Sequence, residues 1–268
     1  SPPAPAGARE AAMRAIAGEV LGYTVAFGIP ELRRRIARSY QERYGLALDS
    51  ERVVVTVGSS GAFLLAFLSA FDAGDRVALA APGYPAYRNI LTALGIEVVE
   101  LPVGPETRYQ PTPGHLLALD RPVDGLILAS PSNPTGTMVT SAELAALASC
   151  CHELGIRLVS DEIYHGISYG LEEATAAAVS PSAIVVNSFS KYYSMTGWRI
   201  GWMVVPPDHV RVIERLAQNM FICPPHASQL AALAALDCTP EAEGNLAVYA
   251  ENRRLMLEGL PKAGFDRI

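Results

Sequence analysis

The sequence has little charge and no excess of basic residues. Charged residues make up 18% of its 268 residues and hydrophobic residues 50%. Such a chain can bury a large core, which excludes a disordered, solvating protein. The 21 lysines and arginines are outnumbered by 27 acidic residues, for a net charge of −6. Nucleic-acid-binding proteins usually carry a basic excess, so we expect no nucleic acid among the partners.

Cysteine and histidine are too few and too scattered for a disulfide scaffold or a common metal motif. The 4 cysteines and 5 histidines include no HxxxH or HExxH pair, and the adjacent Cys150 and Cys151 fit no common metal spacing. We therefore expect no metal site. Few cysteines without a disulfide framework indicate a reducing compartment, so we expect a cytoplasmic protein.

No long hydrophobic run and no targeting segment is visible. The longest apolar stretch, Ala62–Phe71, is about half the length that a membrane-spanning helix needs. The N-terminus has no basic region followed by an apolar run, so we expect no membrane partner. The first residue is Ser1, and an extended segment begins near Gly264 just before the last residue. We expect the sequence to be part of a longer chain.

Short apolar runs alternate with helical segments along most of the chain. These runs are rich in Val, Ile and Leu, as in strands that are covered on both faces. The alternation predicts an α/β fold with a mostly parallel, doubly wound sheet. The expected strands are Arg52–Val57, Arg76–Ala80, Val98–Leu101, Gly125–Ala129, Arg157–Ser160, Ala183–Asn187 and Arg199–Val205.

Helices are expected between several of these strands and at the C-terminal end. The expected helices are Ser60–Phe71, Ala86–Leu94, Ser141–Leu154 (with Ser141 as its cap), Asp208–Asn219 and a long polar helix over about Pro240–Leu260. We divide the chain into an N-terminal segment (1–22), a large domain (23–238), and a linking helix with the start of a small domain (239–268).

Polar and small residues follow the predicted strands at their carboxyl ends, where doubly wound sheets bind ligands. Their concentration at one edge indicates a binding site. These segments are Gly58-Ser59-Ser60-Gly61, Pro82-Gly83-Tyr84-Pro85, Ser130-Pro131-Ser132-Asn133-Pro134-Thr135-Gly136, Asp161-Glu162-Ile163-Tyr164 and Ser188-Phe189-Ser190-Lys191.

Each segment has both a functional and an ordinary interpretation. Gly58–Gly61 joins a strand to a helix, which suits anion binding but also ordinary capping. Lys191 follows an apolar strand and could form a Schiff base if desolvation lowered its pKa, or it could be a surface lysine. Asp161 could hold a buried cation or be a solvated acid. Arg199 could bind a phosphate through its guanidinium, or it could form a salt bridge with a surface acid. Asn133 could donate a hydrogen bond to a ring oxygen, or it could be a plain turn residue.

Together these residues match one ligand. They offer a phosphate cup, a Schiff-base lysine, an acid for a ring cation, donors for a ring oxygen and an aromatic side chain to stack on a ring. Pyridoxal 5'-phosphate (PLP) requires this set. The residues concerned are Ser59, Ser60, Ser188 and Arg199 for the phosphate, Lys191, Asp161, Asn133 with Tyr164, and Tyr84.

The order and spacing of these segments resemble the class I/II aminotransferases, the aspartate-aminotransferase-like PLP enzymes of fold type I. The resemblance covers nearly the whole chain. It rests on Tyr23-Thr24-Val25-Ala26-Phe27-Gly28-Ile29-Pro30-Glu31-Leu32-Arg33, Thr56–Ala62, Pro82–Pro85, Ser132–Gly136, Asp161–Tyr164, Ser188–Lys191 and Gly197-Trp198-Arg199-Ile200-Gly201.

The resemblance implies a role for each matching residue. Lys191, Asp161 and Tyr84 are expected to be catalytic: Lys191 binds the cofactor and carries the proton, Asp161 pairs with the ring nitrogen, and Tyr84 stacks on the ring. Asn133 and Tyr164 would bind the ring oxygen. The phosphate would be held by Ser59, Ser60, Gly61, Ser188, Arg199 and, more weakly, Ser190.

The resemblance also implies the reaction and the assembly. An amino group would move between an amino acid and a 2-oxo acid by ping-pong kinetics. Tyr23 matches the tyrosine that reaches the phosphate of the neighbouring subunit, which implies a homodimer. Family members have an arm before the position of Ser1 and a small domain beyond that of Ile268. That small domain carries the arginine for the substrate carboxylate, and no residue here matches it.

Other activities share the same cofactor residues. One alternative is a C–S lyase or a synthase of fold type I, which acts on a different bond of the substrate. Another is the effector domain of a PLP-binding transcription regulator, which would need a DNA-binding helix-turn-helix. No such motif is visible, and the acidic charge balance disfavours it.

Overall fold

The computed structural model describes residues 2–265 and contains one seven-stranded sheet in the order β1-β7-β6-β5-β4-β2-β3. All pairings are parallel except those of β7, which runs antiparallel to β1 and β6. The predicted α/β class and mostly parallel sheet are confirmed. The strands are β1 (Val53–Thr56), β2 (Arg76–Ala81), β3 (Glu97–Pro102), β4 (Gly125–Ala129), β5 (Arg157–Asp161), β6 (Ile184–Ser188) and β7 (Gly201–Val204).

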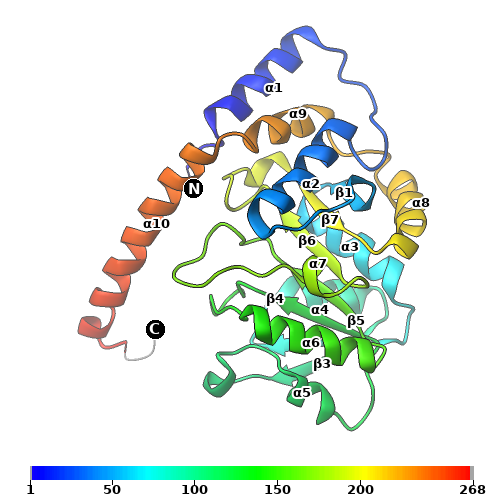
Figure 1. Cartoon of the computed structure of the whole chain (residues 1–268), viewed down its shortest axis with the longest axis vertical. Helices are drawn as coiled ribbons and strands as arrows, with labels where there is room; N and C mark the ends of the chain where they lie inside the picture. The colour runs from blue at the N-terminus through cyan, green and yellow to red at the C-terminus, as the bar shows by residue number, and fades with distance from the viewer. Residues whose placement is uncertain (1, 266–268) are drawn as a thin grey trace.

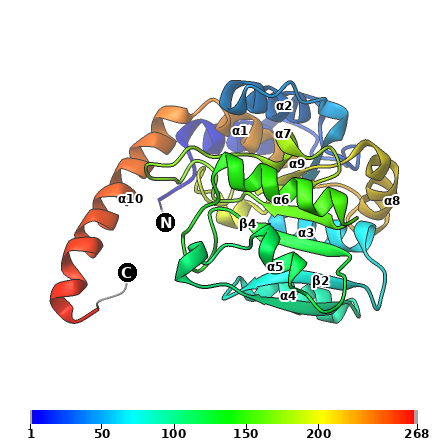
Figure 2. The same cartoon turned by 60° about the horizontal axis from the view of Figure 1, so that its bottom comes forward.

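Helices cover both faces of the sheet (Figure 1; Figure 2). One face carries α3 (Gly58–Ala70), α4 (Pro85–Ala93) and α8 (Val210–Met220), whose apolar side chains form one of the two core clusters. The second cluster lies on the opposite face. The helices on that face are α1 (Ala6–Gly18), α2 (Pro30–Tyr44), α5 (Pro113–Leu117), α6 (Ser141–Glu153), α7 (Ala176–Val179) and α9 (His226–Ala235).

Successive side chains of a strand point to opposite faces of the sheet, so each strand contributes residues to both core clusters. Val53 and Val55 face the core beneath α2, whereas Val54 faces the core beneath α3. All three are at most 2% exposed, so β1 is a buried apolar strand, as its run of valines predicts. Short 3₁₀ helices complete the chain: η1 (Ser50–Arg52), η2 (Pro105–Thr107), η3 (Thr196–Trp198), η4 (Pro207–His209) and η5 (Pro261–Ala263).

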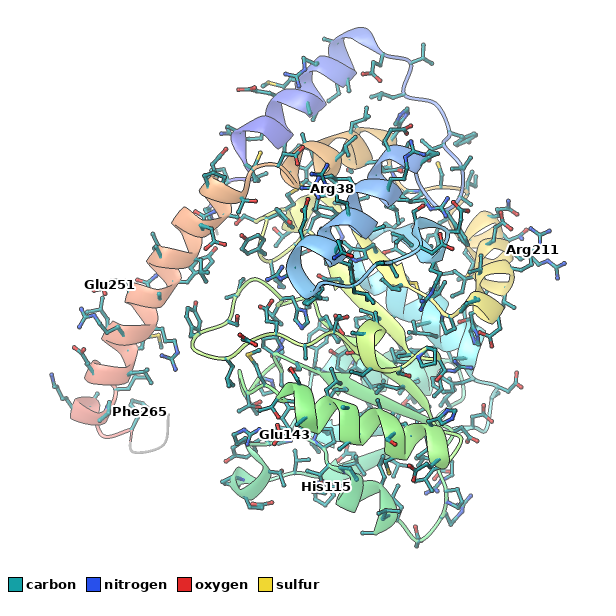
Figure 3. All side chains as sticks on the ribbon, viewed as in Figure 1. Arg38, His115, Glu143, Arg211, Glu251 and Phe265 are labelled. Atoms are coloured by element: carbon teal, nitrogen blue, oxygen red, sulfur yellow. The ribbon has the colours of Figure 1, made fainter. Side chains whose placement is uncertain are left out.

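Element boundaries agree with the expected ones to within a few residues, but the cap assigned to α6 was wrong. Thr140, not Ser141, is the N-cap: its hydroxyl accepts the Glu143 N–H, and the Glu143 carboxylate accepts the Thr140 N–H. The cap lies one residue earlier than expected, so Glu143 stands at the third helical position that a capping box requires. Glu143 is labelled at this end of α6 in Figure 3.

The first and last α-helices differ in how much of their surface they bury against the rest of the protein. Helix α1 buries Ala8, Ala12 and Ala15 against α9, and this spacing of three to four residues puts the small side chains on one helix face. Helix α10 (Thr239–Gly259) instead projects from the body, and among described residues it buries only Ala242 (Figure 1).

The described chain ends beyond α10 at Phe265, which is labelled in Figure 3 and is 60% exposed. The extended segment expected from Gly264 onward falls partly outside the described residues. Across residues 2–265, every helix is too short or too polar to cross a membrane.

Candidate active site

A cavity of about 240 Å³ lies where the strands of the parallel part of the sheet end. Ala129 and Asp161 are the last residues of β4 and β5, and Lys191 follows β6. The site is therefore at the edge of the sheet that the polar strand ends predict. The cavity is lined by Ser59, Ser60, Phe63, Tyr84, Ala86, Tyr87, Ile90, Ala129, Pro131, Asn133, Asp161, Ile163, Tyr164, Ser190, Lys191, Thr196 and Arg199.

Asp161 is the buried acid of this cavity, with 4% of its surface exposed. Its Oδ1 accepts the Ile163 N–H at 3.0 Å, and its Oδ2 accepts the Tyr87 hydroxyl. Burial raises the pKa of Asp161 to about 6, against the opposing effect of these hydrogen bonds. The carboxylate is therefore charged at neutral pH and can pair with a buried cation.

Glu162 follows Asp161 but points to the opposite side of the sheet, as alternation along a strand requires. Its Oε1 accepts the Ser160 hydroxyl at 3.0 Å and the Ala176 N–H at 2.8 Å. Its other oxygen lies 3.6 Å from Nδ1 of His165. Glu162 does not line the cavity, so only one of the two acids belongs to the site.

The N-terminus of α3 and Arg199 together form a site for an anion. Within the described part of the chain, no side chain caps α3, so its first N–H groups at Ser59 and Ser60 remain available. Gly58 has φ +65°, and a Cβ there would lie 2.5 Å from Nη2 of Arg199. The glycine thus admits the guanidinium beside the helix end. Arg199 also donates from Nη1 to the Thr196 carbonyl at 2.9 Å.

Lys191, Asn133 and Tyr164 occupy the same cavity from three different loops. The Lys191 Nζ lies 5.5 Å from the centre of the Tyr164 ring. Burial raises the pKa of the Tyr164 hydroxyl, and a hydrogen bond with Asn133 opposes that rise. The amine is therefore beside a phenol and an amide that can bind an oxygen atom of a ligand.

Tyr84 lines the cavity from the N-cap position of α4, and Tyr87 lies one turn further along the helix. The two rings meet edge to face, with centroids 5.4 Å apart. Tyr87 also packs against Phe63 on α3, at 5.1 Å. Sequence reasoning missed both Tyr87 and Phe63. The aromatic residue three positions after Tyr84, where a helix repeats its face, was the available signal.

Nine of the expected site residues line the cavity and three do not. Gly61 is buried in α3, where a Cβ would lie 3.5 Å from the Val57 side chain. The Ser188 hydroxyl contacts Ser190 Oγ at 2.8 Å and the Ile200 carbonyl at 3.2 Å, and Ser188 lines a second cavity on the other side. Tyr23 is 83% exposed, in the segment between α1 and α2.

Comparisons with known proteins identify the family. The model of the family described as aminotransferase class I and II matches residues 3–268. A valine–pyruvate aminotransferase of Mycobacterium tuberculosis is 55% identical, over 99% of this chain and 69% of that protein. An aspartate/prephenate aminotransferase of Thermus thermophilus is 32% identical, over 98% of this chain and 70% of that protein.

Solved structures agree. The crystal structure of an aminotransferase from Mycobacterium tuberculosis matches with a TM-score of 0.98 and 55% identity, covering 100% of this chain and 70% of that one. The structure of the Thermus thermophilus aspartate aminotransferase with maleate matches with a TM-score of 0.91 and 32% identity. The match covers 97% of this chain and 70% of that one. The chain therefore belongs to the class I and II aminotransferase family.

Membership in the family defines the chemistry. This protein is a PLP-dependent enzyme of fold type I that moves an amino group between an amino acid and a 2-oxo acid. Its cavity fits the cofactor: an uncapped helix end beside Arg199 suits a phosphate, and the buried Asp161 suits a ring cation. Because the relatives described above are aminotransferases, transamination is favoured over the lyase, synthase and regulator alternatives.

Proposed function

We propose that the cavity at the ends of β4, β5 and β6 is both the PLP site and the catalytic centre. The observation that carries this proposal is the convergence of Lys191, Asp161 and Arg199 on one cavity beside the uncapped end of α3. In the proposed arrangement Ser59, Ser60, Gly61, Ser188, Ser190 and Arg199 hold the phosphate, Asn133 and Tyr164 hold the ring oxygen, and Tyr84 stacks on the ring.

Lys191 and Asp161 have different roles in the proposed mechanism. PLP, when bound, supplies an electron-withdrawing ring that stabilises negative charge at the substrate Cα. Lys191 Nζ takes the proton from that Cα, and its place beside Tyr164 supports this role. Asp161 stays ionised at neutral pH, because its pKa is about 6, and keeps the ring nitrogen protonated.

We further propose that the donor is a small branched aliphatic amino acid and the acceptor is pyruvate. The support is the valine–pyruvate aminotransferase that is 55% identical to this chain over the 269 aligned residues. The cavity offers apolar walls from Phe63, Ile90 and Ile163 beside its polar groups. Alternation of donor and acceptor at one site gives ping-pong kinetics.

The proposed enzyme is a homodimer in which Tyr23 reaches the phosphate of the neighbouring subunit. Tyr23 is 83% exposed, and the apolar Val20 and Val25 flank it at 92% and 57%. Exposed apolar residues grouped in this way are typical of an interaction surface. Gln229 holds the segment in place, accepting the Ile29 N–H at 2.7 Å and donating to Thr24 Oγ1 at 3.0 Å.

The domain boundaries and the location are part of the same proposal. Residues 23–238 would form the large PLP-binding domain, with 1–22 as the N-terminal segment and 239–268 leading into the small domain. The projection of α10 away from the sheet supports this division (Figure 1). The four cysteines are unpaired within the described chain, which supports a cytoplasmic location.

Absorption spectroscopy with a matched lysine control tests the proposed function. The sequence contains two lysines, Lys191 and the exposed Lys262. Purified enzyme with PLP should show a visible absorbance band that valine bleaches while the matching 2-oxo acid appears. We expect this conversion to be lost in Lys191→Ala and retained in Lys262→Ala. Conversion that survives in Lys191→Ala would contradict the proposed catalytic centre.

A further inference from the structure

Tyr87 connects two parts of the cavity that act on the same ligand. Its side chain is 4% exposed and extends from α4 toward the end of β5. There its hydroxyl donates to Oδ2 of Asp161. Its ring also packs edge to face with the rings of Tyr84 and Phe63. One side chain thus contacts both the proposed partner of the ring nitrogen and the proposed stacking residue.

The two donors to Asp161 fix its carboxylate from opposite elements. The Ile163 N–H belongs to the loop after β5 and binds Oδ1, whereas the Tyr87 hydroxyl comes from α4 and binds Oδ2. With both oxygens held, the carboxylate plane has one orientation. Removing the hydroxyl would leave one oxygen unbonded in a buried site, which is unfavourable for the charged form.

Tyr87 can donate throughout the working range of pH. Burial, followed by the negative charge of Asp161, raises the pKa of the Tyr87 hydroxyl well above its ordinary value. The phenol therefore keeps its proton and acts as a fixed donor. The other charged or titratable groups around Asp161 and Tyr87 are Glu162, Tyr84, Tyr164 and Lys191.

We propose that Tyr87 is a positioning residue for the cofactor ring. Its hydroxyl holds the Asp161 carboxylate in the orientation that pairs with the ring nitrogen, and its ring supports Tyr84. This inference rests on the cofactor placement proposed above. It assigns no proton-transfer step to Tyr87, which acts through Asp161.

The test is the affinity of the apoenzyme for PLP as a function of pH, measured by equilibrium dialysis. Tyr87→Phe removes the hydroxyl and keeps the ring. Tyr44→Phe is the matched control, because Tyr44 is a half-buried tyrosine whose hydroxyl binds His165, outside the cavity. We expect Tyr87→Phe to bind PLP about tenfold more weakly than wild type at pH 7, and Tyr44→Phe to bind it equally well.

The pH dependence separates positioning from a general loss of packing. Affinity should fall as pH drops through the pKa of Asp161, because the acid loses its charge. Without the Tyr87 hydroxyl that pKa rises, so we expect the midpoint to move to higher pH by about one pH unit. The other titratable groups of the cavity and of the cofactor are the same in wild type and in Tyr87→Phe, so they do not contribute to the difference between the two midpoints. Thermal melting monitored by circular dichroism checks that both variants are folded.

A double-mutant cycle with Asp161→Asn decides whether Tyr87 acts through Asp161. In the Asp161→Asn background, Tyr87→Phe should cost much less PLP affinity than in wild type. An equal cost in both backgrounds, or an unchanged affinity and midpoint in Tyr87→Phe alone, would overturn the inference while leaving the proposed function intact. Unchanged PLP affinity in Asp161→Asn alone would overturn the cofactor placement, and the role of Tyr87 with it.

Discussion

Asp161 and Glu162 are neighbours in the chain and both are buried, at 4% and 1% exposure, yet their surroundings differ. Asp161 faces the cavity that contains Lys191 and Tyr164. Glu162 faces the other layer, where it accepts hydrogen bonds from Ser160 and from the backbone of Ala176. The difference follows from the alternation of side chains at the end of β5.

The comparison shows what makes a buried acid available for function. Burial raises the pKa of both carboxyl groups, so burial alone does not distinguish them. Asp161 is in contact with a space where a cationic ligand can bind. Glu162 is enclosed by protein, and its bonded oxygen ties β5 to the start of α7. This difference supports the proposed role of Asp161 in catalysis and leaves Glu162 a role in stability.

The largest expected effect distinguishes the two acids by activity. Asp161→Asn removes the charge that is proposed to keep the cofactor ring nitrogen protonated, and we expect kcat/KM to fall by about 10²- to 10³-fold. Glu162→Gln retains an oxygen acceptor on the far side of the sheet, so we expect kcat/KM within a few-fold of wild type. Steady-state kinetics with valine and pyruvate measures both. A loss in Glu162→Gln as large as in Asp161→Asn would contradict the different roles of the two acids.

The second prediction concerns the contribution of Glu162 to the stability of the fold. Glu162→Ala leaves the Ser160 hydroxyl and the Ala176 N–H without their buried acceptor, and we expect a loss of about 2–3 kcal/mol in the free energy of unfolding. Urea denaturation of the apoenzyme measures this loss. Glu162→Gln is the control and should lose less, because its amide oxygen can accept the same bonds. Equal losses in both variants would show that the charge, not the acceptor, stabilises this layer.

The third effect is a pH dependence with a defined sign. The pKa of Asp161 is raised from 3.8 to about 6 in the folded chain, so its charge opposes folding above pH 6 and the cost disappears toward pH 4. The apoenzyme of Asp161→Asn should therefore be more stable than wild type at pH 7.5, by about 3 kcal/mol for a rise of about two pKa units, and the advantage should shrink at pH 5. Urea denaturation at the two pH values checks this. An advantage that grows at low pH has the wrong sign.

The smallest expected change in the free energy of unfolding concerns the N-cap of α6, which lies away from both acids. Thr140→Ala removes the N-cap of α6, and we expect a loss of about 1 kcal/mol. Ser141→Ala should cost less, because Thr140 makes the cap and Ser141 is the first residue of the helix. Comparing the two variants by urea denaturation tests the corrected cap. A larger loss in Ser141→Ala would restore the original assignment.

Much of the site was predictable because parallel strands bring their ends together. Lys191 and Asp161 are 30 positions apart in the sequence, yet each stands at a strand end, so both were expected at one edge. The apolar runs also predicted the sheet, since buried strands need continuous Val, Ile and Leu. The sheet and the position of the site can be predicted from the order and direction of the strands alone, without knowing where any side chain points.

Orientation is what the sequence left undetermined. Ser188 ends β6, and alternation alone could not say which side of the sheet its hydroxyl faces without a fixed boundary for the strand. Tyr87 was missed because its contact with Asp161 depends on how α4 rotates over the sheet. The Thr140 cap differs from the expected Ser141 by one residue, which is within the usual uncertainty of helix ends.

Identifying the lysine that binds the cofactor tests the proposed site most directly. The PLP-loaded enzyme is treated with sodium borohydride, which makes a lysine-bound cofactor permanent, and the modified peptide is identified by mass spectrometry. We expect modification of Lys191, with Lys262 unmodified. A cofactor attached to Lys262, or to neither lysine, would contradict the proposed site.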